Sequence, residues 1–377
     1  MPRPDFSYRA ALASFAAVVC LLLHALLWAE PKQEAGPKPE RAYLVDASLL
    51  GDGLVKKLAD AGATALVIEL NEKSTAADFE KATRFAQKNK LGLYGWIEVA
   101  RNPEMARQHP DWMASLGFHD DWRKRFPDFP KAGDNDVVKV WPWVTIWYEE
   151  AYQAQLARVK KLLAAAPAGL KGLYLNDIQG APSSCGCGND QCRWAQDYHI
   201  ASTATKRAAP DTPAQFVAEV RKLMPNTPVI PVWCIECEEI DQDYSRPGTG
   251  YCGGVGCFKG LCWKEYFKQL APVLKETDNA LAVAALSREF RRDAQVYEGT
   301  PGWIGAAIDT FRTMPPRHDL PAVPASALQL VLQGWDDNSD RLTAELARAE
   351  EAGCRRTIVS LIKVDQSWRP VMHAVSR

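Results

Sequence analysis

The chain of 377 residues contains 47% hydrophobic and 24% charged residues, the ordinary composition of a globular protein with a sizeable core. That length suits one large α/β domain or two smaller ones. The net charge of −1 creates no overall field that would attract nucleic acid or an anionic membrane surface, so no nucleic-acid partner is expected. The 13 tryptophans are the compositional anomaly. Some should cap core edges, and the rest predict flat apolar faces suited to a sugar ring or an aromatic ligand.

Residues 1–29 have the pattern of an export signal. Arg3 and Arg9 supply a positive start, residues 11–29 form an apolar run, and Ala29 is a small residue at the expected cleavage point. A run of this length also suits an uncleaved membrane anchor, so both alternatives stay open. Residues 30–41 follow as a solvated linker, before a single domain at 42–377. We therefore expect an exported protein (periplasmic, cell-surface or secreted) that meets a membrane only through this segment, if it is retained.

Past the linker, short apolar runs alternate with amphipathic helical segments. Near-continuous apolar runs are typical of parallel strands buried on both faces. Eight strands alternating with helices predict an α/β fold of the (β/α)8 or TIM-like barrel type. An open doubly wound sheet is the alternative, disfavoured because no G-x-G-x-x-G follows the first run. The expected strands are residues 42–48, 65–71, 92–100, 172–179, 229–234, 281–287, 327–334 and 357–364. The expected helices are residues 52–62, 75–90, 149–166, 212–224, 263–276, 301–314 and 340–353.

Two connections between these elements are long, residues 101–148 after the third strand and residues 235–262 after the fifth. Loops of this length in a compact domain are usually functional or stapled. Both should emerge at the C-terminal face of the barrel, where barrel enzymes place their chemistry.

Two segments, "GLYGWIEVARNPEMARQHPDWMA" (92–114) and "VTIWYEEAYQAQLARVKKLLAAAPAGLKGLYLNDIQ" (144–179), resemble the exported glycoside-hydrolase-like barrel proteins. In that group, a third strand precedes an HPxW-type loop, and a long helix leads into a fourth strand that ends in an acidic residue. Some relatives also carry a cysteine motif after that strand, and such chains are often described only as hydrolases or metal-binding proteins. The resemblance covers about residues 42–200 and implies a barrel with a carbohydrate-related role. One departure is Asn176-Asp177, where the best-known retaining glycosidase barrels have Asn-Glu, which leaves Asp177 open between acid/base and nucleophile.

Hydrolysis of a glycosidic bond needs two carboxyl groups beside the scissile oxygen, one protonated and one ionised. In a barrel they come from the C-terminal ends of different strands. Acidic residues occur at or near all eight expected strand ends: Asp46, Glu69, Glu98, Asp177, Glu236, Glu289, Asp336 and Asp365. Asp177 ranks first because it ends the fourth strand just before a Gly-Ala-Pro loop, with a helix cap or a loop anchor as its alternative role. The catalytic candidates are Asp177, Glu98, Glu236, Glu289 and Asp336.

Substrate-binding candidates accompany these carboxylates. Trp335 lies beside Asp336 and is a natural sugar platform. No G-x-S-x-G, P-loop or H-E-x-x-H occurs, so esterase, phosphoryl-transfer and zincin functions lose their usual support. The expected substrate-binding residues are Asn176, Trp96, Trp143, Trp233 and Trp335.

Eight of the ten cysteines gather between residues 185 and 262. Loops after adjacent barrel strands are neighbours, so all eight sulfurs can meet at one side of the mouth. In an exported protein, disulfides are the default interpretation. A structural zinc is the alternative, with His199 available to complete a Cys3His site, and an iron–sulfur or redox centre is a third option. In each case the cluster should hold the loops after the fourth and fifth strands together. Its members are Cys185, Cys187, Cys192, Cys234, Cys237, Cys252, Cys257 and Cys262.

Two functions of different classes follow from these patterns. The first is an exported hydrolase of a poly- or oligosaccharide, which uses paired carboxylates and requires no cofactor. The second is a non-catalytic barrel that binds carbohydrate or a metal, in which the cysteine loops are functional and a zinc is structural.

Overall fold

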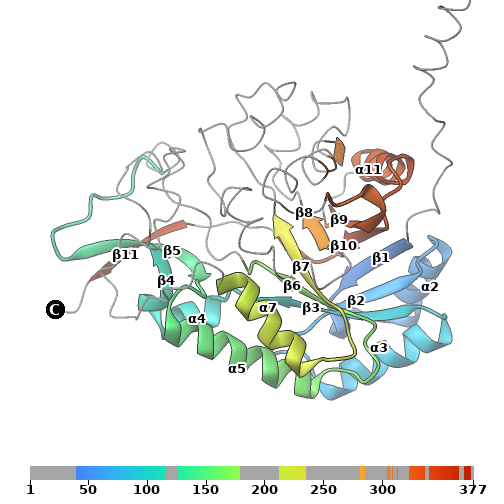
Figure 1. The fold of residues 1–377 in the computed structure, drawn as a ribbon, viewed down its shortest axis with the longest axis horizontal. Coiled ribbons are helices and arrows are strands. Elements are labelled where there is room, and N and C mark those ends of the chain that lie inside the picture. The colour runs from blue at the N-terminus through green and yellow to red at the C-terminus, as the bar shows by residue number, and fades with distance from the viewer. Residues whose placement is uncertain are drawn as a thin grey trace, which may run out of the picture. The chain divides into compact units, whose positions relative to one another are not determined.

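Eight parallel strands form a closed barrel (Figure 1). The computed structural model describes residues 40–115, 126–178, 212–234, 281–284, 322–335, 339–364 and 369–374, with residues 304, 305, 308 and 312. The order around the barrel is β1-β10-β9-β8-β7-β6-β3-β2, so β1 and β10 close the ring. The predicted TIM-like strand pattern is confirmed. The strands are β1 (Glu40–Val45), β2 (Ala65–Glu69), β3 (Gly92–Glu98), β6 (Leu173–Asn176), β7 (Val229–Cys234), β8 (Leu281–Ala284), β9 (Leu328–Gln333) and β10 (Arg356–Ser360).

Helices follow the strands along the chain and cover the outside of the sheet (Figure 1). The helix α3 (Ala76–Lys88) begins with a capping box, in which Thr75 and Asp78 each accept a hydrogen bond from the other's backbone N–H. The expected helix at 263–276 and most of the one at 301–314 lie outside the described residues. The other helices of the barrel are α2 (Asp52–Asp60), α5 (Glu149–Ala165), α7 (Thr212–Leu223) and α11 (Ser339–Glu351), with short 3-10 turns η1 (Ala47–Leu49) and η6 (Ala325–Ala327).

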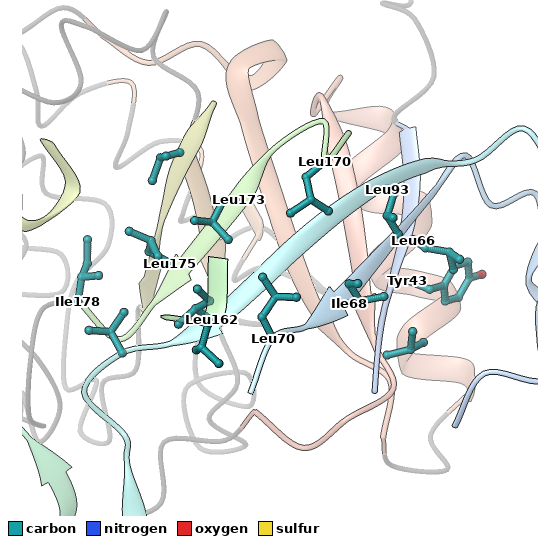
Figure 2. Packing of buried hydrophobic residues seen from close by; sticks show 14 of the residues in the cluster. Tyr43, Leu66, Ile68, Leu70, Leu93, Leu162, Leu170, Leu173, Leu175 and Ile178 are labelled. Atoms are coloured by element: carbon teal, nitrogen blue, oxygen red, sulfur yellow. The ribbon is translucent and has the colours of Figure 1, made fainter. Parts of the chain in front are cut away.

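The strands bury both faces, as their continuous apolar runs predict. Leu66 and Ile68 on β2, together with Leu173 and Leu175 on β6, point outward into the layer between strands and helices (Figure 2). Side chains at the alternate positions fill the barrel interior. The inward set includes Ala42, Leu44, Val67, Trp96, Tyr174, Ile230, Val232, Val331 and Ile358.

A buried polar network fills the N-terminal end of the barrel. The guanidinium of Arg356 donates to the hydroxyls of Tyr174 (2.8 Å) and Tyr94 (2.7 Å) and pairs with Glu40. Tyr174 in turn donates to Oε1 of Gln329 at 2.5 Å. Because each buried polar group finds a partner, this network ties five strands together (β1, β3, β6, β9 and β10) at the end of the barrel opposite the expected site.

The connection after β3 contains a second sheet that the sequence did not predict. It holds α4 (Pro103–Gln108), η2 (Pro110–Trp112), β4 (Met113–Ser115) and β5 (Asp136–Val144). The C-terminal strand β11 (Arg369–Ala374) pairs antiparallel with β5, giving the order β11-β5-β4. Residues 101–148 are therefore only partly a loop.

The proposed export segment and residues 30–39 of the linker lie outside the described residues, and the last two linker positions begin β1. Within the described part of the chain, no helix has the length and apolar character needed to cross a membrane.

Candidate active site at the barrel mouth

Strands β2, β3 and β6 direct polar side chains toward the axis at the C-terminal end of the barrel. Leu44, Val67, Trp96 and Tyr174 all pack in the barrel interior. Strand side chains alternate between faces, so the residues two positions further along share the inward face. On β2, β3 and β6 those residues are Glu69, Glu98 and Asn176, while Asp46 lies just past β1 and caps η1, accepting a hydrogen bond from the N–H of Ser48.

Glu98 is held by two neighbouring side chains. Its Oε1 accepts a hydrogen bond from Nε1 of Trp96 at 2.7 Å, and its Oε2 accepts one from Nδ2 of Asn176 at 2.8 Å. Asn176 comes from β6, and it is 1% exposed. Two N–H donors on different oxygens fix the plane of the Glu98 carboxyl group, so it is pre-oriented at the mouth.

Glu69, the last residue of β2, interacts with Glu98 through its charge. Burial, followed by the negative charge of Glu98, raises the pKa of Glu69 to about 7. A hydrogen bond from Nδ2 of Asn71 to Oε2 (2.8 Å) and the positive charge of Arg158 oppose this rise, while Asp46 adds to it. Glu69 can therefore donate a proton near neutral pH, and Glu98 is the neighbouring carboxylate.

Asp177, the first-ranked candidate from the sequence, lies directly after β6 and is fully buried. Its φ of 57° is in the left-handed region, which a non-glycine residue occupies rarely and often near functional sites. The contact with Glu98 comes from its neighbour Asn176. A catalytic role for Asp177 stays a prediction.

Two of the tryptophans expected to bind substrate are fully buried. Trp96 and Trp143 are 0% exposed, Trp96 inside the barrel and Trp143 in the small sheet, so neither offers an open ring face. Trp96 instead orients Glu98. Trp335 is partly buried against the interior cluster at the mouth, and its role as a sugar platform stays a prediction. It follows Gly334, where an added Cβ would lie 2.5 Å from Val359, so only glycine allows this close approach to β10.

Many predicted site residues lie outside the described residues. Within the described part, no group of three or more His, Cys, Asp or Glu side chains is arranged to hold a metal ion. Cys354, which is described, is a buried free thiol. The predictions that fall outside concern the side chains of Trp233 and Cys234, and also Glu236, Glu289, Asp336, Asp365, Cys185, Cys187, Cys192, His199, Cys237, Cys252, Cys257 and Cys262.

Two residues of the candidate site, Glu69 and Arg158, are not among the site residues that the sequence predicts. Glu69 is one of the eight strand-end acids but is not among the catalytic candidates that the sequence predicts, although it shares its two-residue phase with Val67 of the barrel interior. That phase was readable from "ALVIEL" and is the signal that could have selected it. Arg158 lies in the middle of α5, where the sequence pattern of a surface helix gives no sign of its contact with β3.

Comparison with known proteins adds little to this geometry. No protein-family model matches the chain, and no curated protein matches it. Solved structures that it resembles include active domain 2 of a thermostable chitinase from Pyrococcus furiosus, with 12% identity, a TM-score of 0.42, and coverage of 86% of this chain and 84% of that one. An α-amylase from Lactobacillus plantarum gives 11% identity, a TM-score of 0.38, and coverage of 85% and 70%.

An endonuclease IV from Thermus thermophilus is similar to the same extent, with 11% identity, a TM-score of 0.37, and coverage of 85% of this chain and 91% of that one. Two of these three enzymes act on carbohydrates and the third is an endonuclease, so the likeness selects no activity. The side chains at the mouth are therefore the features of this protein that bear on its function.

Proposed function

We propose that the protein is an exported carbohydrate-active hydrolase that cleaves O-glycosyl bonds of a poly- or oligosaccharide at the barrel mouth. The observation that supports this is the Glu69–Glu98 pair, two interacting carboxyl groups at the C-terminal ends of adjacent strands. One has its pKa raised to about 7 and the other is held by two N–H donors. Unequal environments of this kind assign acid and carboxylate roles in glycosidases.

In the proposed reaction, protonated Glu69 gives its proton to the glycosidic oxygen as the bond to the anomeric carbon breaks. The Glu98 carboxylate stabilises the positive charge that develops on the sugar. It then either takes a proton from a water molecule that adds to the anomeric carbon, or bonds to that carbon itself to give a glycosyl-enzyme that water hydrolyses, with Glu69 taking the proton of that water. Trp335 supplies an apolar platform at the rim. The reaction requires no cofactor, and the cysteine cluster, as disulfides or a structural zinc, serves to hold the loops.

Export is proposed from the N-terminal pattern alone. Asp177, Glu236, Glu289 and Asp336 remain candidates for additional roles at the same face.

The test is hydrolysis of a panel of polysaccharides and chromogenic glycosides, followed by substitution of each carboxyl group. Glu69→Gln and Glu98→Gln should each lower kcat/KM by about 10²- to 10⁴-fold, the usual size of a general acid–base contribution. Glu80→Gln, an exposed glutamate on α3, is the matched control and should retain activity.

Three outcomes would count against the proposal. Absence of cleavage across the panel rejects a hydrolase, and glycan binding without cleavage favours the non-catalytic alternative. Full activity in both glutamine variants, with loss in Asp177→Asn, would move the catalytic role to Asp177.

A further inference from the structure

The backbone carbonyl of Glu98 lies where β2 has already left the sheet. In the β2–β3 ladder, Glu69 is opposite Trp96, and the N–H of Leu70 donates to the carbonyl of Trp96 at 2.8 Å. Two residues further along a parallel ladder, the N–H of Glu72 would serve the carbonyl of Glu98. The chain instead turns at Asn71, whose Oδ1 accepts from the N–H groups of residues 73 and 74. The ladder position beside Glu98 is thus vacated by β2.

Arg158 of α5 takes this position. Its Nη1 donates to the Glu98 carbonyl at 2.7 Å, while its Nε pairs with the carboxylate of Glu72. The Arg158 side chain is 13% exposed, against 56% for Glu72. One guanidinium therefore joins the end of β3 to the loop after β2, using two N–H groups of its rigid planar fork.

A second residue of α5 reinforces the same strand end. Gln155, one helical turn before Arg158, is fully buried, and its Nε2 donates to the carbonyl of Val99 at 2.7 Å. The N–H of Val99 donates to the carbonyl of Asn176 at 3.0 Å. Consecutive carbonyls at the end of β3 are consequently fixed by α5, so the Glu98 side chain starts from an anchored backbone.

Arg158 also changes the electrostatics of the site. Among the described residues, the charged groups that act on Glu69 are Glu98 on β3, Asp46 after β1 and Arg158 on α5. Arg158 is the positive member of this set, and its charge lowers the pKa of Glu69 against the larger effect of burial. Partial burial also opposes ionisation of Glu72, but the hydrogen bond and charge of Arg158, together with a backbone hydrogen bond and the charge of Lys161, hold the Glu72 pKa below its usual range.

We propose that Arg158 is a positioning residue for the Glu69–Glu98 pair, because it replaces the missing ladder donor beside Glu98 and supplies the positive charge that balances Glu69. Only its consequence for catalysis rests on the proposed function. Its effect on the protonation of Glu69 can be measured with no substrate present.

The experiment follows the carboxyl carbon of Glu69 by NMR across pH, with the signal assigned by its loss in Glu69→Gln. Arg158→Gln should raise the Glu69 midpoint by roughly half a pH unit or more, because the opposing positive charge is gone. Arg84→Gln, which removes an exposed arginine from α3, is the charge-matched control and should leave the midpoint unchanged. An unchanged midpoint in Arg158→Gln, or an equal shift in Arg84→Gln, overturns the proposal.

A second variant guards against loss of folding in Arg158→Gln. Glu72→Gln keeps Arg158 but removes the exposed carboxylate that neutralises it, so the Glu69 midpoint should fall. A rise in the midpoint, or no movement, contradicts the role given to Arg158.

The outcomes separate this inference from the proposed hydrolase activity. Midpoint shifts of the expected sign, in a protein that cleaves no glycan, support the role of Arg158 and reject the hydrolase. In an active enzyme, Arg158→Gln should move the alkaline limb of the kcat/KM profile upward in pH by the same amount as the Glu69 midpoint, because Glu69 must stay protonated to donate. If cleavage requires both Glu69 and Glu98 but the Glu69 midpoint does not move in Arg158→Gln, the hydrolase is supported and the role of Arg158 is rejected.

Discussion

Glu69 has properties that no single residue of the sequence encodes. Its position at the end of an apolar strand is readable, and its inward phase follows from Val67. Its raised pKa depends on burial and on Glu98, a residue on another strand. Glu98 and Asn176 were both chosen from the sequence, but their hydrogen bond joins residues 78 positions apart. Sequence therefore predicts which residues end the strands, and the folded neighbours decide which of them interact.

The raised pKa of Glu69 predicts a pH-dependent cost to stability. The folded protein holds this proton up to about pH 7, whereas a glutamate with its ordinary pKa of 4.5 releases it earlier. The stabilisation from Glu69 is thus present below pH 4.5 and lost as pH rises to 7. Glu69→Gln should gain about 3 kcal/mol of unfolding free energy relative to the parent between pH 4 and pH 8, because the pKa moves from 4.5 to about 7 on folding. Denaturant unfolding across this range measures it, with Glu80→Gln as the control; a difference that does not change with pH would refute the expectation.

At the scale of elements, the eight barrel strands were predictable because each is an apolar run whose phase and length match a doubly buried strand. The small sheet was not. Its β4 has only three residues, and β11 pairs with β5 across more than two hundred positions, so neither gives a local signal. A lysine at the centre of "DVVKVWPWV" also breaks the apolar pattern of β5.

That lysine, Lys139, is fully buried, and its Nζ donates to the carbonyls of Asp111 and Met113, each at 2.9 Å. It joins β5 to β4 and to η2, which contains the last three residues of the "HPDW" segment. Burial lowers the pKa of Lys139 to about 8, against an opposing effect of Asp111.

Lys139 gives the small sheet a pH dependence opposite in sign to that of Glu69. Between pH 8 and 10.5 the unfolded chain binds this proton more tightly than the folded one, so stability from this residue increases with pH in that window. Between pH 7 and pH 9.5, the unfolding free energy of the parent should increase by about 1–2 kcal/mol relative to that of Lys139→Met. Urea unfolding at a series of pH values, with exposed Lys222→Met as the control, measures the gap. If the unfolding free energy of the parent minus that of Lys139→Met stays constant or falls as the pH rises, Lys139 does not titrate in this way.

At the scale of the whole molecule, the two ends of the barrel have different chemistry. Arg356, Tyr94, Tyr174 and Gln329 make a buried, mutually satisfied network at one end, and acidic and amide groups face the axis at the other. This division matches barrel proteins generally, in which the C-terminal end carries function and the N-terminal end carries stability.

Whether the eight clustered cysteines form disulfides or bind zinc can be measured on the full-length protein. If the eight cysteines of residues 185–262 form disulfides, thiol titration of the unfolded, unreduced chain should detect Cys354, plus Cys20 if the N-terminal segment is retained. Elemental analysis should then find no zinc. Stoichiometric zinc with many reactive thiols after unfolding would reject the disulfide interpretation and support a structural metal.

Two pairings join distant parts of the chain: β1 with β10, and β5 with β11. On a ribosome the chain emerges from its N-terminus, so β1 waits for residues 356–360 and β5 for residues 369–374. Until then each presents unpaired backbone groups, which are prone to association with other chains. The barrel cannot be completed before residues 356–360 have been made, nor the small sheet before residues 369–374, so a chain truncated ahead of β10 should remain a client of chaperones.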